Sequence, residues 1–457
     1  MHLNDTIAAI ATPPGRGGVG IVRVSGRMAM DVLRRLFMPR NGNNEFKSHK
    51  MYYGEIVDLK SIVIDAGLCV CMNAPHSYTG EDTVEFHCHG SPAILSRLLE
   101  EINQLGVRTA FPGEFSKRAF INGKIDLVEA EAILDLVNAA GSESARLALN
   151  QLKGSLSKRI EEIRDELLAL LSGIDAGIDF PESVDESQNL EERLGGLLSI
   201  KAKIDALVSS YKTGRMIKDG LLIQIIGKPN VGKSSLFNAL LGRDRAIVHH
   251  EPGTTRDYIE EELALNGITV RLVDSAGLWL TGEGVEAEGI RRANEVARSA
   301  DAFLMVIDAS LELKDEDFSF TEIVSGKNGI AVLNKMDLLP SIKQKNIPSS
   351  LKKFESVCVS AKTGAGIADL RQNLKSLCLG VIPPVEPGMV TRVRHLDCLR
   401  RSLNGIENTI NDIKDSAPMA IVSDELHRAI KPLGELLGEE IEESLMDRIF
   451  SEFCIGK

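Results

Sequence analysis

One short segment has the residue types and spacing of a phosphate-binding loop. It reads Gly227-Lys-Pro-Asn-Val-Gly-Lys-Ser234 and lies between the apolar run Leu221 to Ile226 and leucines at helical spacing. Glycines let successive backbone N–H groups converge on phosphate oxygens, Lys233 adds positive charge at the terminal phosphates, and Ser234 offers a hydroxyl to Mg2+. An ordinary strand-turn-helix connection is the alternative. Because the pattern and its flanks agree, the segment predicts a nucleoside triphosphate site.

Two later segments predict that the base is guanine. Asn334-Lys-Met-Asp337 follows a strand-like run, and the Asp337 carboxylate can accept hydrogen bonds from N1–H and the N2 amino group of guanine. Adenine lacks both donors and would leave the carboxylate unpaired. Ser360-Ala-Lys362 follows another strand-like run and would complete the base pocket. These segments predict GTP rather than ATP.

Two segments between these motifs are candidates for sensing the γ-phosphate. Asp274-Ser-Ala-Gly277 ends a strand-like run, where the Asp can hold the water shell of Mg2+ and the Gly N–H can face the γ-phosphate. Gly253-Thr-Thr-Arg-Asp257 precedes it, and Thr255 could join the Mg2+ shell from a mobile loop. Arg256 is either an arginine finger in cis or a side chain neutralised by Asp257.

Another residue must orient the attacking water. Leu278 stands where Ras-like proteins carry a glutamine, and Glu286 is the acidic candidate that a flexible segment could deliver. A solvated carboxylate at a helix start is the alternative. Asn266-Gly267 predicts a hairpin between two strands, and three more strands with possible helices follow. The four loops resemble a translation-factor-like GTPase domain, a mostly parallel α/β sheet with one antiparallel edge.

The composition describes an ordinary soluble protein of several domains. The chain has 457 residues, of which 43% are hydrophobic and 26% charged. Its net charge of −12 argues against nucleic-acid binding over the whole surface, so any RNA contact must use local patches or a partner. Seven cysteines, an odd number, indicate reduced thiols. With no signal-like start and no apolar run near about 20 residues, we expect a cytoplasmic protein without membrane spans.

Residues 1–124 predict a mixed α and β domain. Strand-like runs at 6–11 and 19–24 are followed by helical spacing up to Leu36. In the run 83–89, Glu85 alternates with apolar residues and shares one face with two histidines. The histidines and Cys88 suggest zinc, but no second cysteine pair closes a tetrahedral site. A polar strand that faces a ligand is therefore favoured over zinc.

Helical patterns flank the GTPase region on both sides. We expect one apolar stripe to face a core; it comprises Leu190, Leu194, Leu197, Leu198, Ile204, Leu207 and Val208. The segment 178–182 predicts a turn, and the proline-rich segment 383–387 a linker before helical spacing returns. We therefore predict an N-terminal α+β domain at 1–124, a helical domain from segments 125–216 and 378–457, and an inserted Ras-like P-loop GTPase domain at 217–377.

Over essentially its whole length the chain resembles the MnmE (TrmE) family of tRNA-modifying GTPases, of the TrmE-Era-EngA-like superfamily. The resemblance rests on the GTPase motifs and on five other stretches, which are Asp5 to Ile7, Ala11 to Ile21, Ser77 to Gly90, Pro112 to Ser116 and Phe453-Cys-Ile-Gly-Lys457. It implies a homodimer that works with an FAD-carrying partner, MnmG, on tRNA. The pair would add an aminomethyl or carboxymethylaminomethyl group to C5 of the wobble uridine.

The resemblance also implies a folate site and a role for the C-terminal cysteine. Arg23, Glu85, Lys124 and Lys457 would bind a one-carbon tetrahydrofolate, such as the 5-formyl or 5,10-methylene form. Cys454 matches a family cysteine considered for catalysis, by thiolate attack or proton transfer. An inert, half-buried thiol is the alternative.

In the GTPase domain, the resemblance implies potassium-stimulated hydrolysis with dimerisation of the G domains. Asn230, Thr254 and the main-chain carbonyls of His249 and Glu251 would hold K+, which supplies charge where an arginine otherwise acts. Glu286 would position water, and Ser234 and Thr255 would bind Mg2+. The expected GTP-binding residues are Asn230, Val231, Gly232, Lys233, Ser234, Ser235, His249, His250, Glu251, Pro252, Gly253, Thr254, Thr255, Asp274, Ser275, Ala276, Gly277, Asn334, Lys335, Met336, Asp337, Ser360, Ala361 and Lys362.

Two other functions fit parts of the sequence. A GTP-dependent binding switch, for instance in ribosome assembly, would use the same motifs without small-molecule chemistry. It would not require the folate-like region or the segment Cys454 to Lys457. A structural scaffold would leave the GTP site unexplained.

Overall fold

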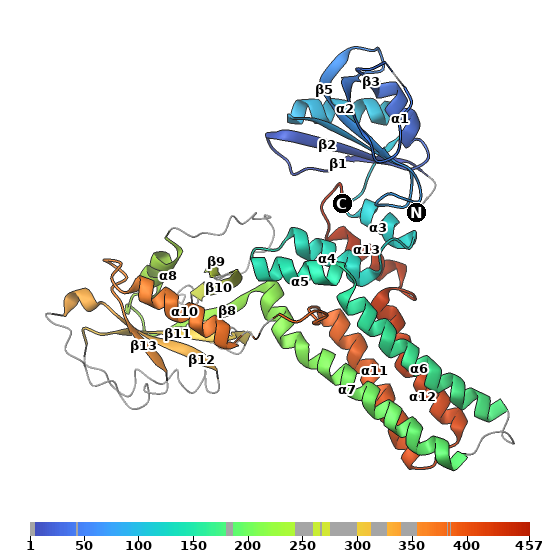
Figure 1. Ribbon diagram of the computed structural model, residues 1–457. Coiled ribbons are helices and arrows are strands. Elements are labelled where there is room, and N and C mark those ends of the chain that lie inside the picture. Colours follow the sequence, from blue (N-terminus) through green and yellow to red (C-terminus); the bar gives the residue numbers. More distant parts are fainter. Residues whose placement is uncertain are drawn as a thin grey trace, which may run out of the picture. The chain divides into compact units, whose positions relative to one another are not determined.

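Two compact units make up the chain. The computed structural model describes residues 5–42, 44–179, 186–242, 259–265, 267–274, 299–311, 327–339, 354–381, 383 and 385–457 (Figure 1). The first unit comprises Met1–Leu134, Leu152–Asp185 and Asn408–Lys457, and the second comprises Asp135–Gln151 and Glu186–Glu407. Each unit is therefore assembled from segments that are far apart in the sequence.

The first unit contains a seven-stranded sheet in the order β3-β4-β5-β6-β2-β1-β7. Its strands are β1 (Ile7–Ile10), β2 (Gly17–Ser25), β3 (Phe37–Pro39), β4 (Met51–Val57), β5 (Val63–Met72), β6 (Thr83–Gly90) and β7 (Arg108–Thr109). Every pairing is antiparallel except that of β1 with β7. The strands predicted at 6–11, 19–24 and 83–89 are confirmed as β1, β2 and β6.

Two helices cover one face of this sheet, while on the other face Phe115 packs against Ile7 and Ala9 of β1. Helices α1 (Ala29–Leu36) and α2 (Pro92–Gln104) bury Leu33 and Leu98 against Val84 and Phe86 of β6. Because side chains alternate along β6, Glu85 and His87 lie on the opposite face. The sheet thus presents a polar strand on the face that α1 and α2 leave uncovered.

The first unit continues into helices from both ends of the chain. They are α3 (Glu114–Ile121), most of α4 (Leu127–Val137), α6 (Ser155–Asp179), α12 (Met419–Leu437) and α13 (Glu443–Ser451). Helix α12 packs along α6, and Ser423 Oγ donates to Asp175 Oδ1 at 2.7 Å. Phe450 and Phe453 join Leu127 in a common apolar cluster. The helical spacing predicted for residues 426–453 is confirmed by α12 and α13 as far as Ser451, whereas Phe453 follows the end of α13.

The second unit contains a six-stranded sheet in the order β13-β12-β11-β8-β10-β9. Its strands are β8 (Leu221–Ile226), β9 (Ile259–Leu265), β10 (Ile268–Asp274), β11 (Ala302–Asp308), β12 (Asn328–Asn334) and β13 (Glu355–Cys358). Only β9 is antiparallel to its neighbour. Helices α8 (Lys233–Leu241) and α10 (Ile367–Val381) contribute to its core. The predicted parallel sheet with one antiparallel edge is confirmed.

Three more helices belong wholly or largely to the second unit. They are α5 (Ser142–Leu152), α7 (Glu186–Asp219) and α11 (Val393–Lys414). Leu147 of α5 and Met216 of α7 are buried in the same core as β8 and β10. The sequence assigns both helices to the helical domain, yet they share this core; the four predicted domain limits remain predictions.

The expected apolar stripe of α7 is correct in part. Leu197, Ile204 and Leu207 are buried, but Leu198 is 52% exposed. A residue one position along a helix is rotated by about 100°, so Leu197 and Leu198 cannot share a narrow stripe. Ile200, three residues after Leu197, is buried instead. Among the helices of the described ranges, none has the length and apolar character needed to cross a membrane.

Candidate functional site

The phosphate-loop motif folds as a tight turn between β8 and α8. Gly227 and Gly232 have φ of 152° and 95°, a region of the backbone that L side chains rarely adopt. A Cβ on Gly227 would lie 2.4 Å from the carbonyl oxygen of Val306, and one on Gly232 would lie 2.4 Å from Asn334 Nδ2. Both positions therefore require glycine because the neighbouring segments approach the loop closely.

A cavity of about 500 Å3 lies at this turn. It is lined by Pro229, Asn230, Gly232, Lys233, Ser234, Ser235 and Lys335. All but Lys335 come from one loop and the first turn of α8, where backbone N–H groups favour anions. Lys335 comes from the segment predicted to bind guanine. The structure thus places the predicted phosphate and base segments around one cavity.

The lysine of the loop is buried and held by main-chain oxygens. Lys233 Nζ donates to the carbonyl oxygens of Gly227 and Lys228, both at 2.9 Å. Burial lowers the pKa of Lys233, and nearby Asp274 opposes that shift. An anion in the cavity would favour the charged ammonium for the same electrostatic reason.

The predicted Mg2+ residues of the described segments meet directly. Ser234 Oγ donates to Asp274 Oδ2 at 2.7 Å, and Asp274 is only 2% exposed at the end of β10. Because β10 pairs in parallel with β8, both strands deliver their carboxyl ends to the same edge. A hydroxyl and a carboxylate are hard oxygen donors, so this pair fits Mg2+.

Asn334 ties the base segments to the phosphate loop, and two further bonds join these segments to each other. Asn334 Nδ2 donates to the Val231 carbonyl at 2.9 Å, and Asn334 Oδ1 accepts from the N–H of Ala361 at 3.0 Å. Ser360 Oγ donates to Asp337 Oδ1 at 2.6 Å. Met336 and Lys362 lie within the same two segments. Asn334 therefore fixes the spacing between the cavity's phosphate end and its base end.

Several predicted residues lie outside the described residues. They are His249, His250, Glu251, Pro252, Gly253, Thr254, Thr255, Arg256, Asp257, Ser275, Ala276, Gly277, Leu278 and Glu286. Of the predicted K+ ligands, the structure therefore describes Asn230 alone. Asn230 has a φ of 65°, which is uncommon for a residue other than glycine.

A second polar site lies on the uncovered face of the N-terminal sheet. Arg23 Nε donates to Glu85 Oε1 at 2.8 Å, and His87 Nε2 lies 3.2 Å from Glu85 Oε2. The contacts with His87 and Arg23 lower the pKa of Glu85 although burial opposes the shift. The Arg23 guanidinium also lies 5.6 Å from the ring centre of Tyr78 and 5.5 Å from that of Phe115. Glu85 is thus held as a carboxylate beside a cation.

The last residues of the sequence join this site. Arg23 Nη1 donates to the carbonyl of Gly456 at 3.3 Å, and the Phe115 N–H donates to the carbonyl of Lys457 at 3.1 Å. Lys124 Nζ donates to the Pro75 carbonyl at 3.0 Å, at the start of the loop that carries Tyr78. Arg23 thus contacts both Glu85 and the segment that ends in Lys457, while Lys124 contacts the adjacent loop.

Two alternatives from the sequence are wrong in the structure. Cys454 is exposed, so it is not the half-buried thiol of the alternative interpretation. Cys88 is buried beneath the sheet whereas His89 is exposed and bonds Asp65, so they cannot share a zinc ion. Within the described ranges, no three His, Cys, Asp or Glu residues are grouped to hold a metal.

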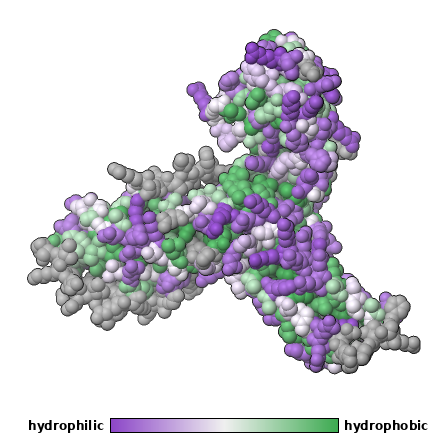
Figure 2. Space-filling model, viewed as in Figure 1, coloured by the Kyte–Doolittle hydropathy of each residue, from purple (hydrophilic) through white to green (hydrophobic). Residues whose placement is uncertain are grey.

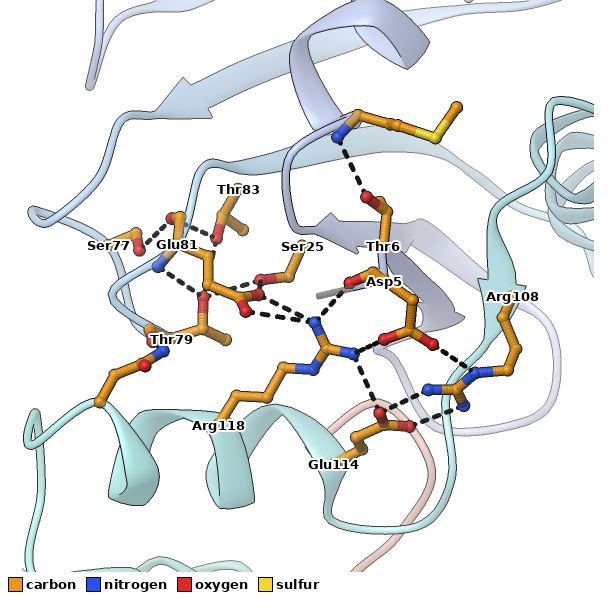
Figure 3. Close-up of polar contacts among 12 residues, drawn as sticks. Asp5, Thr6, Ser25, Ser77, Thr79, Glu81, Thr83, Arg108, Glu114 and Arg118 are labelled. Carbon is orange, nitrogen blue, oxygen red and sulfur yellow. Dashed lines mark hydrogen bonds and ion pairs between the residues drawn. The ribbon is translucent and has the colours of Figure 1, made fainter. Parts of the chain in front are cut away.

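A buried ionic network supports the second site, and sequence reasoning missed its central residue. Arg118 is 1% exposed and lies among Asp5, Glu81 and Glu114 (Figure 3). Arg108 donates to both oxygens of Glu114, at 3.0 and 2.7 Å. These bonds join Asp5, two residues before β1, to the loop before β6 and to helix α3. The stretches on which the family resemblance rests include the nearby segment Pro112 to Ser116, which contains Glu114, but not Arg118. A buried arginine has no local sequence signal that distinguishes it from an exposed one.

Comparisons with known proteins cover the entire chain. Family models described as "MnmE helical domain" and "GTP-binding protein TrmE N-terminus" match residues 127–454 and 6–124. The tRNA modification GTPase MnmE of Alkaliphilus oremlandii is 40% identical over 461 residues, and that of Roseiflexus sp. is 41% identical over 467 residues; each match covers 100% of both chains. The G domain of the T. maritima FeoB iron transporter is 26% identical over 35% of this chain, with a TM-score of 0.26.

Proposed function

Because the chain belongs to the MnmE family of tRNA modification GTPases, we propose that it hydrolyses GTP to drive a modification of tRNA. The observation that carries this proposal is the convergence of Lys233, Ser234, Asp274 and Lys335 at one edge of the parallel sheet. This edge brings together groups that can bind phosphate and Mg2+, which supports the proposal because GTP hydrolysis depends mainly on positioning and charge stabilisation.

Each part of the cavity has a distinct role in binding GTP. Backbone N–H groups at the start of α8 and the Lys233 ammonium bind the phosphates. The exposed Asp337 carboxylate, oriented by Ser360, accepts from the two donors on guanine. Ser234 and Asp274 would hold Mg2+, which when bound neutralises charge on the phosphate oxygens. Asn230, Thr254, His249 and Glu251 would hold K+, and Glu286 would orient the attacking water.

The second site would bind a one-carbon derivative of tetrahydrofolate. The Glu85 carboxylate can accept from pterin N–H groups, while Lys124 and Lys457 can meet the carboxylates of the folate glutamate. Tyr78, which is half-buried beside Arg23, offers a flat apolar surface for the pterin ring, whereas Phe115 is fully buried and supports Arg23 from within the core. The fit is chemical: a carboxylate, an arginine and an aromatic ring occur together, with the segment that ends in Lys457 beside them.

The one-carbon unit would be used to build the group placed on tRNA. With an FAD-carrying partner of the MnmG type, the protein would add an aminomethyl or carboxymethylaminomethyl group to C5 of the wobble uridine. Cys454 is exposed and lies two residues before Gly456, which contacts Arg23. We assign Cys454 proton transfer or thiolate attack near the bound folate, a role that its exposure supports.

The uncovered sheet face also suits a second copy of the chain. Met38, Met51, Tyr53 and Leu68 of β3, β4 and β5 are 47%, 48%, 51% and 38% exposed. Figure 2 shows apolar side chains among polar ones on the surface of this domain. Large exposed apolar side chains on adjacent strands are typical of an interface between subunits. A homodimer through this face would bury them, and GTP-dependent pairing of the G domains would be a second contact.

Mass spectrometry of tRNA nucleosides tests the proposed function. Cells depleted of the protein should lose C5-aminomethylated wobble uridines, and wild-type chain should restore them, whereas Lys233→Ala should not. The matched control is Lys228→Ala. Lys228 belongs to the same loop, but it is not among the residues that line the cavity. If the modified uridines persist in depleted cells that hold no second copy, the proposal is wrong and a GTP-dependent switch in ribosome assembly becomes the better account.

Equilibrium dialysis with 5-formyltetrahydrofolate tests the second site separately. The full-length wild-type chain should bind this folate, and Glu85→Gln should bind it more weakly. Asp65→Asn is a suitable control, since Asp65 pairs with His89 on the neighbouring strand and is not in the Arg23 cluster. Equal folate binding by wild type and Glu85→Gln would remove Glu85 from the folate site.

A further inference from the structure

An ion pair that no sequence motif predicted lies beside the nucleotide cavity. Lys335 Nζ lies 2.6 Å from Asp308 Oδ2. Asp308 is the last residue of β11 and is aligned with Asn334, the last residue of β12. Because the two strands are parallel neighbours, Asp308 reaches the same carboxyl edge as the base segment. The pair therefore connects the end of β11 to the wall of the cavity.

The carboxylate of Asp308 is held in place by Ser310 as well as by Lys335. Asp308 is 8% exposed, and its Oδ1 accepts from the Ser310 N–H at 2.9 Å and from Ser310 Oγ at 2.6 Å. The bonds from Lys335 and Ser310 lower the pKa of Asp308, although burial opposes that shift. With Oδ1 held by Ser310, only Oδ2 is directed at Lys335.

Lys335 is held in an unusual backbone conformation at the same place. Its φ and ψ are 66° and 34°, the left-handed region that lysine rarely adopts. Lys335 lines the cavity, whereas its ammonium is bound by Asp308. The four-carbon stem between these two ends is apolar and is left against the cavity.

We propose that Asp308 is a positioning residue for guanine nucleotides, which holds the Lys335 stem as a preformed apolar wall for the base and ribose. The inference rests on the proposed GTP site and adds a residue that does not itself touch the nucleotide. An unanchored lysine loses rotamer freedom when a ligand covers it, whereas the anchored one has lost that freedom beforehand. Asp308 thereby tightens binding without any contact of its own.

Dissociation of a fluorescent GDP from the full-length chain tests this role. Asp308→Asn should weaken GDP binding by about threefold to tenfold, which corresponds to ordering one flexible side chain, and should mainly speed dissociation. Lys335→Met keeps an unbranched stem but removes its anchor, so it should show a similar loss. Adding Asp308→Asn to Lys335→Met should then cause no further loss.

Asp301→Asn is the matched control. Asp301 is the residue just before the first residue of β11, and its side chain is as buried as that of Asp308. It also binds a cation, since Arg215 Nη2 lies 2.6 Å from Asp301 Oδ1. Its loss should leave GDP dissociation unchanged if the effect belongs to the cavity. The inference is overturned if Asp308→Asn and Lys335→Met both release GDP like wild type. It is also overturned if Asp308→Asn weakens GDP binding as much in the Lys335→Met variant as it does in the wild-type chain. Failure of the wild-type chain to bind GDP would instead overturn the proposed function.

Discussion

Single residues at the two sites are held by partners distant in sequence. Asp337 is oriented by Ser360, and Ser234 by Asp274. Glu85 is kept charged by Arg23 and His87. At each position one side chain supplies the chemistry while a second fixes its direction. Substitutions that keep shape but change hydrogen bonding are therefore the most informative at this scale.

Asp337→Asn should change base preference. The amide can accept only at its oxygen and presents an NH2 group to the guanine amino group, so GDP affinity should fall by about 10- to 100-fold. Xanthine carries an oxygen in place of that amino group, and the same NH2 can donate to it. Competition binding with GDP and xanthosine diphosphate measures the change. Unaltered GDP affinity would mean that Asp337 does not contact the base.

Glu114→Gln should destabilise the N-terminal domain by about 3–5 kcal/mol, because it leaves the buried Arg118 charge without one of its carboxylates. Glu114 is 1% exposed, and despite burial the bonds from Arg108, Phe111 N–H and Arg118 lower its pKa from 4.5. Urea unfolding followed by circular dichroism measures the free energy of unfolding. Glu143→Gln, an exposed helical pair with Arg146, is the control and should change little.

The same network predicts how stability depends on pH. The folded-state pKa of Glu114 lies below the unfolded value, so its contribution is complete above about 4.5 and is lost as the pH falls through the folded pKa. The urea midpoint of the N-terminal domain should therefore drop below about pH 4.5. Glu114→Gln should show a shallower drop, and equal pH dependence in both proteins would contradict this account.

At the scale of elements, the β9–β10 hairpin meets a helix outside the GTPase motifs. The Glu143 N–H at the start of α5 donates to the Gly267 carbonyl at 3.1 Å. Gly141 approaches just as closely, since a Cβ there would lie 2.3 Å from the same oxygen. Strand β10 ends at Asp274, beside Ser234. A continuous pair of strands therefore runs from the predicted Mg2+ residues to α5.

Gly267→Ala should loosen this contact. Its φ is 81°, and the new Cβ would lie 2.1 Å from Ser142 Oγ, so we expect a loss of about 1–3 kcal/mol in unfolding free energy. Gly195→Ala is the control: it lies inside α7 with nothing within 4 Å of its Cβ and should be stabilising by about 0.5–1 kcal/mol. Denaturant unfolding followed by circular dichroism compares the two. If Gly267→Ala had the same free energy of unfolding as the wild-type chain, the hairpin tip would accommodate the new Cβ without strain.

At the scale of the whole molecule, neither unit is one continuous stretch of the sequence. The first unit joins the N-terminal sheet to residues 408–457, and the segment ending in Lys457 contacts Arg23 and α3. The second unit holds the nucleotide cavity. The two candidate sites therefore belong to different units, and they can be altered independently.

Gly456→Ala should separate the two activities. Its φ is 95°, and a Cβ would lie 2.4 Å from the Ile10 carbonyl, so the last residues must leave Arg23. We expect loss of tRNA modification with a GTP hydrolysis rate close to wild type, measured by nucleoside mass spectrometry and phosphate release. Ser451→Ala, at the exposed end of α13, should affect neither. Full modification by Gly456→Ala would show that the contact with Arg23 is dispensable.

The sequence by itself determined the features that depend on neighbours along the chain. Glycine spacing placed the phosphate loop, and alternation placed Glu85 on the polar face of its strand, because turns and strand faces follow local rules. Only the tertiary structure showed that Arg118 is a buried ionic centre, that Asp308 anchors Lys335, and that α5 shares the core of the second sheet. These contacts join residues far apart in sequence, and their partners are decided by packing. The sequence around an arginine does not show whether its side chain is buried, because burial depends on which distant segments pack around it.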